Sequence, residues 1–217
     1  MPRLTFDNCV KVHTSPGDKN TLADQEFFNV EFVVNGEQKD EVVYFLSNKN
    51  ALAAASPVFN KQFFGSLKRK RGSDSDPGSV EVIKVGNVAA KAFKKFLQML
   101  FTDRDLTEEF ATACSFNVLF QVLKLADMYC IDDLQASVVK IIENKEITRG
   151  NIIKAIASIE EHRVLQPFGS VCESLMNRCC RMSSLLWPTT QDFFLFCGAN
   201  KHHMDLLYIL LTKVTIP

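Results

Sequence analysis

The stretch Phe45–Phe59, with the sequence FLSNKNALAAASPVF, decides the fold of this chain. It begins at the end of a β-branched and aromatic run, Val42–Phe45, and continues with residues that favour a helix, alanine above all. Ser56-Pro57 interrupts the helical pattern, because serine accepts a hydrogen bond at a helix N-terminus and proline fits the first turn. We therefore predict a strand, a short helix, a break, and a second helix that ends at Phe63-Phe64-Gly65.

The residues before this stretch predict a β-hairpin. Asn29–Gly36 alternates apolar and polar residues, residues 37–41 form a turn, and Val42–Leu46 returns as the second strand. Residues 1–22 are polar and contain the turn cluster Thr14–Asp18, so we expect a loose N-terminal arm.

The residues after it predict one more strand and then only helices. Lys68–Ser79 is a charged loop, and Val80, Val82 and Val85 follow as a third strand. Apolar residues at helical spacing then predict helices near residues 89–101, 117–128, 132–143, 148–160, 165–180 and 206–215. Because strand patterns stop after the polar seam Glu143–Glu146, we expect an α+β unit followed by an all-helical unit, divided near residue 145.

The composition is that of an ordinary globular protein. The chain has 217 residues and a formal net charge of zero, so no global field attracts nucleic acid or an anionic membrane. No apolar run reaches the length of a membrane span, and the N-terminus lacks the apolar core of a secretory signal. Seven cysteines, two of them adjacent, favour reduced thiols in the cytoplasm or the nucleus. Eighteen phenylalanines suit a core and a self-association surface.

Four segments in this order resemble a BTB/POZ domain, a protein-interaction module. The first resembles the initial strand of that family, the second its strand–helix–Ser-Pro–helix core, the third its next strand and Phe-rich helix, and the fourth its Ala-Asp-x-Tyr segment. They are Phe28–Val34, Phe45–Gly65, Val82–Thr102 and Leu125–Leu134. Residues 146–217 resemble the helical BACK segment that often follows. The resemblance implies three parts, a flexible arm at 1–22, a BTB/POZ domain at 23–145 and a BACK-like helical domain at 146–217.

The resemblance implies a homodimer, and an adaptor that brings an unknown substrate protein to a cullin-3 ubiquitin ligase. It requires no cofactor and no catalytic residue. The candidate cullin interface comprises Phe63, Phe64, Leu67, Arg69, Met128 and Tyr129. The candidate dimer interface comprises Leu22, Phe27, Phe28 and Leu52. We expect Tyr129, an aromatic ring with a polar tip, to act as an interface anchor.

Three positions depart from the family pattern. Asn29 and Asn48 occupy places where the family commonly has aspartate and histidine, and we expect the two amides to hydrogen-bond each other. Arg69 stands where many cullin-recruiting members carry glutamate, so a basic residue replaces an acid. The alternative function is therefore a BTB scaffold without a ligase, in transcription or another assembly.

The sequence gives weaker support for a zinc site, a nuclear localisation signal or an enzyme. Cys172, Cys179, Cys180, Cys197, His202 and His203 lack the paired spacing of a structural zinc site and suit core thiols and surface histidines better. The basic run Lys68, Arg69, Lys70 and Arg71 is a candidate nuclear localisation signal, although a solvated loop is the simpler interpretation. A Gly-rich phosphate loop and a nucleophile with its base are both missing, so we expect no enzyme.

Overall fold

The computed structural model describes residues 6–14, 27–36, 41–65, 80–101, 113–162 and 168–186. The chain divides into two compact units, the first formed by residues 1–107 with 121–138 and the second by residues 108–120 with 139–217. From the sequence we predict one division near residue 145. In the structure, residues 108–120 belong to the second unit and residues 121–138 belong to the first. Among the described helices, none combines the length and the apolarity needed to cross a membrane.

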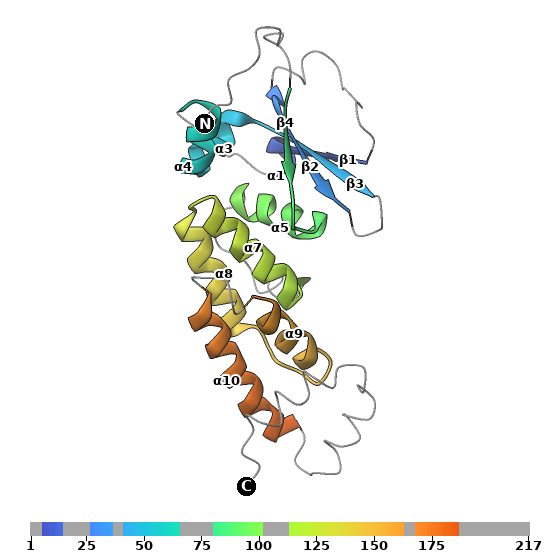
Figure 1. The fold of residues 1–217 in the computed structure, drawn as a ribbon, viewed down its shortest axis with the longest axis vertical. Helices are drawn as coiled ribbons and strands as arrows, with labels where there is room; N and C mark the ends of the chain where they lie inside the picture. Colours follow the sequence, from blue (N-terminus) through green and yellow to red (C-terminus); the bar gives the residue numbers. More distant parts are fainter. Residues whose placement is uncertain are drawn as a thin grey trace. The chain divides into compact units, whose positions relative to one another are not determined.

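The first unit contains a four-stranded sheet in the order β1-β3-β2-β4. Strands β2 (Val30–Asn35) and β3 (Val42–Ser47) pair antiparallel, so the predicted hairpin strands are confirmed. Strand β4 (Glu81–Val85) adds parallel to β2, as the third predicted strand. Figure 1 shows the sheet with helix α5 (Ala90–Phe101) along one face.

The expectation of a loose arm is wrong for residues 6–13. Helix α1 (Phe6–Cys9) is followed by strand β1 (Val10–His13), which pairs antiparallel with β3 and forms an edge of the sheet. The Ser47 hydroxyl donates to the Cys9 carbonyl over 3.0 Å, and Val10 is buried, so both side-chain packing and hydrogen bonds hold the strand. Four residues are too few for a clear alternating pattern, so this strand could not be predicted from the sequence.

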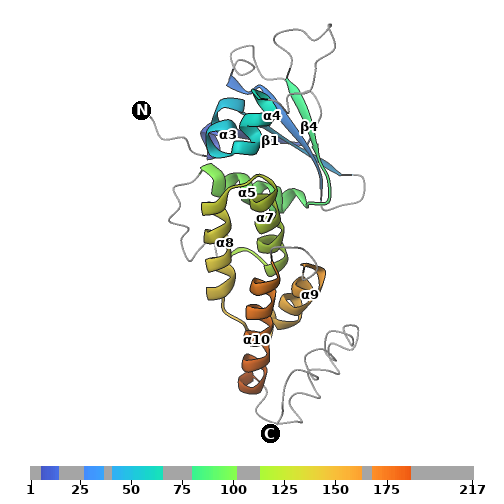
Figure 2. The ribbon, with the colours of Figure 1, turned by 60° about the vertical axis from the view of Figure 1, so that its left-hand side comes forward.

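Helices α3 (Lys49–Ala55) and α4 (Pro57–Phe63) confirm the predicted helix–break–helix, and Figure 2 shows them side by side. The Asn48 side chain accepts a hydrogen bond from the Ala51 amide, and the Ser56 side chain accepts one from the Phe59 amide. Each cap satisfies an amide that would otherwise lack a partner in the first helical turn, which typically contributes about 1 kcal/mol.

The other helices in the described ranges also lie close to the predicted positions. They are α5, α7 (Phe116–Met128), α8 (Asp132–Asn144), α9 (Ile152–His162) and α10 (Gly169–Leu186). The helix expected at residues 206–215 lies outside the described residues.

Five aromatic side chains form the centre of the first unit. Phe32 of β2, Phe59 of α4, Tyr129 after α7, and Phe96 and Phe93 of α5 contact one another in a closed cycle. The ring centroids of successive members lie between 4.0 and 5.9 Å apart, and the four phenylalanines are completely buried. Burial of each phenylalanine contributes on the order of 2 kcal/mol. This aromatic cluster therefore joins the sheet, α4, α5 and the end of α7.

The second unit is helical in its described residues, and α9 packs against α10. Isoleucines at positions 152, 153, 156 and 159 of α9 are buried, as are Cys172, Leu175 and Cys179 of α10. The Arg178 guanidinium donates to the carbonyls of Ile142 and Lys145 over 2.9 and 2.7 Å. Because the last carbonyls of a helix have no partner within it, Arg178 satisfies the end of α8.

Candidate functional site

Two exposed apolar side chains stand out on the first unit, and each is next to a buried aromatic residue. Phe64 follows the last residue of α4 and is 55% exposed, whereas Phe63 is 3% exposed. Met128 ends α7 and is 49% exposed, whereas Tyr129 is 6% exposed. In each pair one side chain enters the core and its neighbour faces solvent.

The two exposed residues lie at opposite ends of one row of aromatic contacts. The Phe64 ring contacts Phe63 edge to face, and Phe63 stacks on Phe59 with a centroid distance of 5.7 Å. Phe59 in turn stacks on Tyr129 at 4.0 Å, and Tyr129 follows Met128. Aromatic pairs in such geometry contribute about 0.5–1.5 kcal/mol each beyond their buried area. Phe64 and Met128 are therefore supported by the same packed core.

Hydrogen bonds fix the chain at both positions. The Ser56 hydroxyl donates to the Tyr129 carbonyl over 2.6 Å, which connects the start of α4 to the end of α7. Helix α7 ends in a Schellman motif, in which the Cys130 amide donates to Asp127 and the Ile131 amide to Ala126. Cys130 holds a left-handed φ of 50° in this motif, a conformation that usually belongs to glycine.

The glycine of the Phe-Phe-Gly turn is required by a close approach. A Cβ atom on Gly65 would lie 2.9 Å from the Lys61 Cα and 3.1 Å from the Lys61 carbonyl oxygen. The Gly65 amide also donates to that carbonyl, which ends α4 and turns the chain just after Phe64.

The rim near Met128 is acidic. Asp127, Asp132 and Asp133 are all exposed, and the Gln135 amide donates to the Asp127 carboxylate over 3.2 Å. Exposed apolar side chains with polar residues near them are typical of protein-interaction surfaces. We call Phe64, Met128 and these three aspartates the docking surface.

The expectation that Tyr129 acts as an interface anchor is corrected. Its ring lies in the aromatic cluster, and burial raises its pKa to about 12. A side chain with so little exposed area supports a surface rather than forming one. Phe63 is likewise a core residue, whereas Phe64 and Met128 are accessible to a partner. Leu67, Arg69 and the whole basic run 68–71 lie outside the described residues.

The described residues of the candidate dimer interface also include both buried and exposed side chains. Leu52 is completely buried and Phe28 is 6% exposed, with the Lys11 amine 4.9 Å from the centre of its ring. These two side chains pack inside the first unit. Phe27 is 41% exposed and lies against Phe28 edge to face, so it is accessible to a second copy. Leu22 lies outside the described residues.

The two asparagines act differently from the expectation that they bond each other. The Asn29 side-chain oxygen accepts from the Lys49 amide over 2.8 Å, and the Asn48 side-chain nitrogen donates to the Phe27 carbonyl over 2.6 Å. Each amide thus binds the backbone beside the other. The Lys49 ammonium also pairs with the Glu81 carboxylate at 2.8 Å. Glu81 lies far away in the sequence, so no short motif could reveal this ion pair.

Four of the six described thiols are buried as core groups. Cys9, Cys114, Cys172 and Cys179 are buried, Cys180 is half-buried and Cys130 is exposed. Burial raises the pKa of Cys9 and of Cys172, and it raises that of Cys179 to about 12. Thiolates at these positions are disfavoured, which suits packing rather than reactivity. Within the described ranges, no three His, Cys, Asp or Glu side chains gather as metal ligands would; Cys197, His202 and His203 lie outside them.

Tyr129 provides a test of this assignment. Replacement by alanine should lower the free energy of unfolding by about 3–5 kcal/mol, because it opens a cavity in the aromatic cluster.

Tyr129→Phe should keep the packing and remove only the titration of the hydroxyl at alkaline pH. Since burial raises the folded pKa above the unfolded value, the stability contributed by the neutral hydroxyl is fully present below about pH 10 and is lost as pH rises through the folded value. Wild type should fall relative to Tyr129→Phe by about 1–1.5 kcal/mol between pH 9 and pH 11. Urea denaturation at both pH values measures the difference, and an alanine variant as stable as wild type would place the ring outside the core.

Comparison with known proteins identifies the module. The family model described as "BTB/POZ domain" matches residues 19–146. The Arabidopsis thaliana protein "BTB/POZ and MATH domain-containing protein 3" is 25% identical over 127 residues, which cover 56% of this chain. The matched region spans only 29% of that relative, so the likeness concerns one part of it. Since the family model covers more than half of the chain, the chain belongs to the BTB/POZ domain family, whose domain is a protein-interaction module.

Proposed function

We propose that this chain is an adaptor that recruits a cullin-3 ubiquitin ligase through the docking surface. The observation that carries the proposal is the exposure of Phe64 and Met128, 55% and 49%, on a single packed aromatic core. Exposed aromatic and methionine side chains are enriched at protein interfaces, because they bury a large apolar area when a partner binds. The family resemblance supplies the identity of the partner.

The mechanism is proximity and requires no catalytic group in this chain. One surface holds the ligase scaffold while another holds the substrate, so the substrate's effective concentration near the ligase rises. We propose that the helical residues 146–217 form a BACK-like domain and present that second surface. The described part of this region contributes α9 and α10. Reduced, buried thiols suit a cytoplasmic or nuclear protein, and the basic run 68–71 would serve nuclear entry.

The rival is a scaffold of the same family that binds no cullin. Arg69 favours it, since a basic residue stands where many cullin-binding members have glutamate. A positive charge at residue 69 would repel a hydrogen-bond donor that binds the glutamate in those members. We therefore expect modest affinity for cullin-3, which Arg69→Glu should improve.

Binding of the purified chain to the N-terminal part of cullin-3, measured by calorimetry, tests the proposal. Phe64→Ala and Met128→Ala should each weaken binding by about 1–2 kcal/mol, because each truncates an anchor of the surface. Val12→Ala is the matched control, since Val12 is 41% exposed but lies on β1. Cullin binding that ignores both anchor substitutions would place the interface elsewhere. If neither wild type nor Arg69→Glu binds, the plain scaffold is the better account.

The same domain should make the chain a homodimer. The excess of phenylalanine and the exposed Phe27 support a self-complementary apolar patch, and two-fold symmetry lets such a patch cover its twin. Light scattering at micromolar concentration should give twice the mass of 24.5 kDa. Phe27→Glu should shift the equilibrium toward the monomer, whereas the exposed Lys61→Glu should leave it unchanged. A monomeric wild type would overturn the dimer.

A further inference from the structure

Among the described strands, β4 has a neighbour on one side and is open on the other. The order β1-β3-β2-β4 gives it a neighbour only in β2. The Glu81 amide donates to the Asn29 carbonyl just ahead of β2, over 3.2 Å, so the backbone groups of Glu81, Ile83 and Val85 face that strand. Successive residues of a strand direct their N–H and C=O groups to opposite sides, so Val82 and Lys84 direct theirs to the open side. The described part of the chain supplies no partner for them there.

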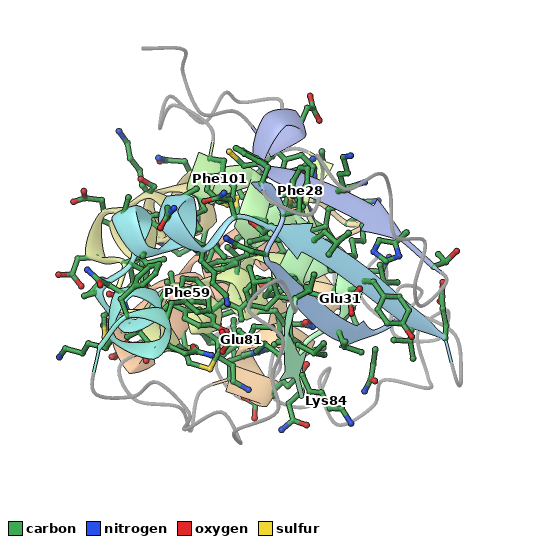
Figure 3. The ribbon with its side chains drawn as sticks, turned by 90° about the horizontal axis from the view of Figure 1, so that it is seen from above. Phe28, Glu31, Phe59, Glu81, Lys84 and Phe101 are labelled. Carbon is green, nitrogen blue, oxygen red and sulfur yellow. The ribbon has the colours of Figure 1, made fainter. Side chains whose placement is uncertain are left out.

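The side chains of these two residues are also exposed. Val82 is 51% exposed, and Lys84 is exposed as well, whereas Ile83 is half-buried and Val85 is buried. In Figure 3, Glu81 and Lys84 both lie along β4, and Lys84 lies at the periphery of the view. An extended segment placed along β4 would therefore meet free backbone groups, one apolar side chain and one ammonium group.

The charge on β4 that is left without an ion-pair partner among the described residues is positive. Glu81 is the one acidic residue of β4, and it is already paired with Lys49. Lys84 is the basic residue of β4 and is exposed, and within the described residues its ammonium has no ion-pair partner. The edge therefore complements a negatively charged segment and opposes a positive one.

We propose that the β4 edge binds an extended acidic segment of a partner protein by strand addition. Backbone hydrogen bonds to Val82 and Lys84 supply affinity, and alternate side chains of the segment contact Val82 and Lys84. A lysine on an edge strand normally discourages the pairing of like edges. The same lysine disfavours a second copy of this chain, whose own β4 would bring another lysine, and selects a partner with carboxylates.

Two synthetic hexapeptides test the idea, one alternating valine with glutamate and one alternating valine with lysine. The valine–glutamate peptide should shift the backbone amide signals of Val82 and Lys84 in NMR spectra of the chain, and its binding should weaken as salt is added. The valine–lysine peptide should bind more weakly. Lys84→Glu should reverse this order of preference, with a change of roughly fivefold for each peptide.

Two further variants separate the backbone from the charge. Val82→Pro removes an amide on the open side and should abolish binding while the thermal midpoint changes little, because the hydrogen bonds to β2 come from the other residues. Lys154→Glu, an exposed substitution on α9, should leave the preference unchanged. Equal binding of both peptides, no binding of either, or binding that survives Val82→Pro would overturn the proposal. So would a loss of dimer mass in Val82→Pro, which would identify a second copy as the occupant.

Discussion

The first unit depends on two hydrogen bonds of the Ser56 hydroxyl. The hydroxyl accepts a hydrogen bond from the Phe59 amide and donates one to the Tyr129 carbonyl, so a single small side chain begins α4 and fixes the chain after α7. Both bonds are buried, where an unpaired amide or carbonyl would cost about 1–3 kcal/mol. The two segments that it joins lie 73 residues apart in the sequence.

The aromatic cluster extends this connection through the unit. Because Phe59 stacks on Tyr129, and both contact rings from the sheet or from α5, α4 cannot move without disturbing the core. Phe64 and Met128 then follow as the first side chains outside the core on each side. The positions of Phe64 and Met128 are thus a consequence of core packing, because each is next to a buried ring of the same row.

The sequence predicts most of the first unit, because local signals and tertiary packing agree there. Ser56-Pro57 fixes the boundary between α3 and α4, and alternation reveals β2 and β3. Strand β1 escapes notice because four residues give too short a pattern. The exposure of Tyr129 is misjudged since a ring with a polar tip suits a core and an interface equally well, and only the packing around Phe59 decides. Contacts such as Lys49 with Glu81, or Asn48 with the Phe27 carbonyl, depend on three-dimensional proximity that no local motif encodes.

The measurement that tests this account most directly compares two serine caps by urea denaturation. Ser115 caps α7 through one bond to the Val118 amide at 3.3 Å and is otherwise exposed, whereas Ser56 has a second, buried partner. Ser115→Ala should cost about 0.5–1 kcal/mol, the value of a cap alone. Ser56→Ala should cost about 2–4 kcal/mol, because it also leaves the Tyr129 carbonyl unpaired in the core. Equal losses in the two variants would contradict the central role of Ser56 and show that the aromatic cluster holds α4 and the end of α7 together without it.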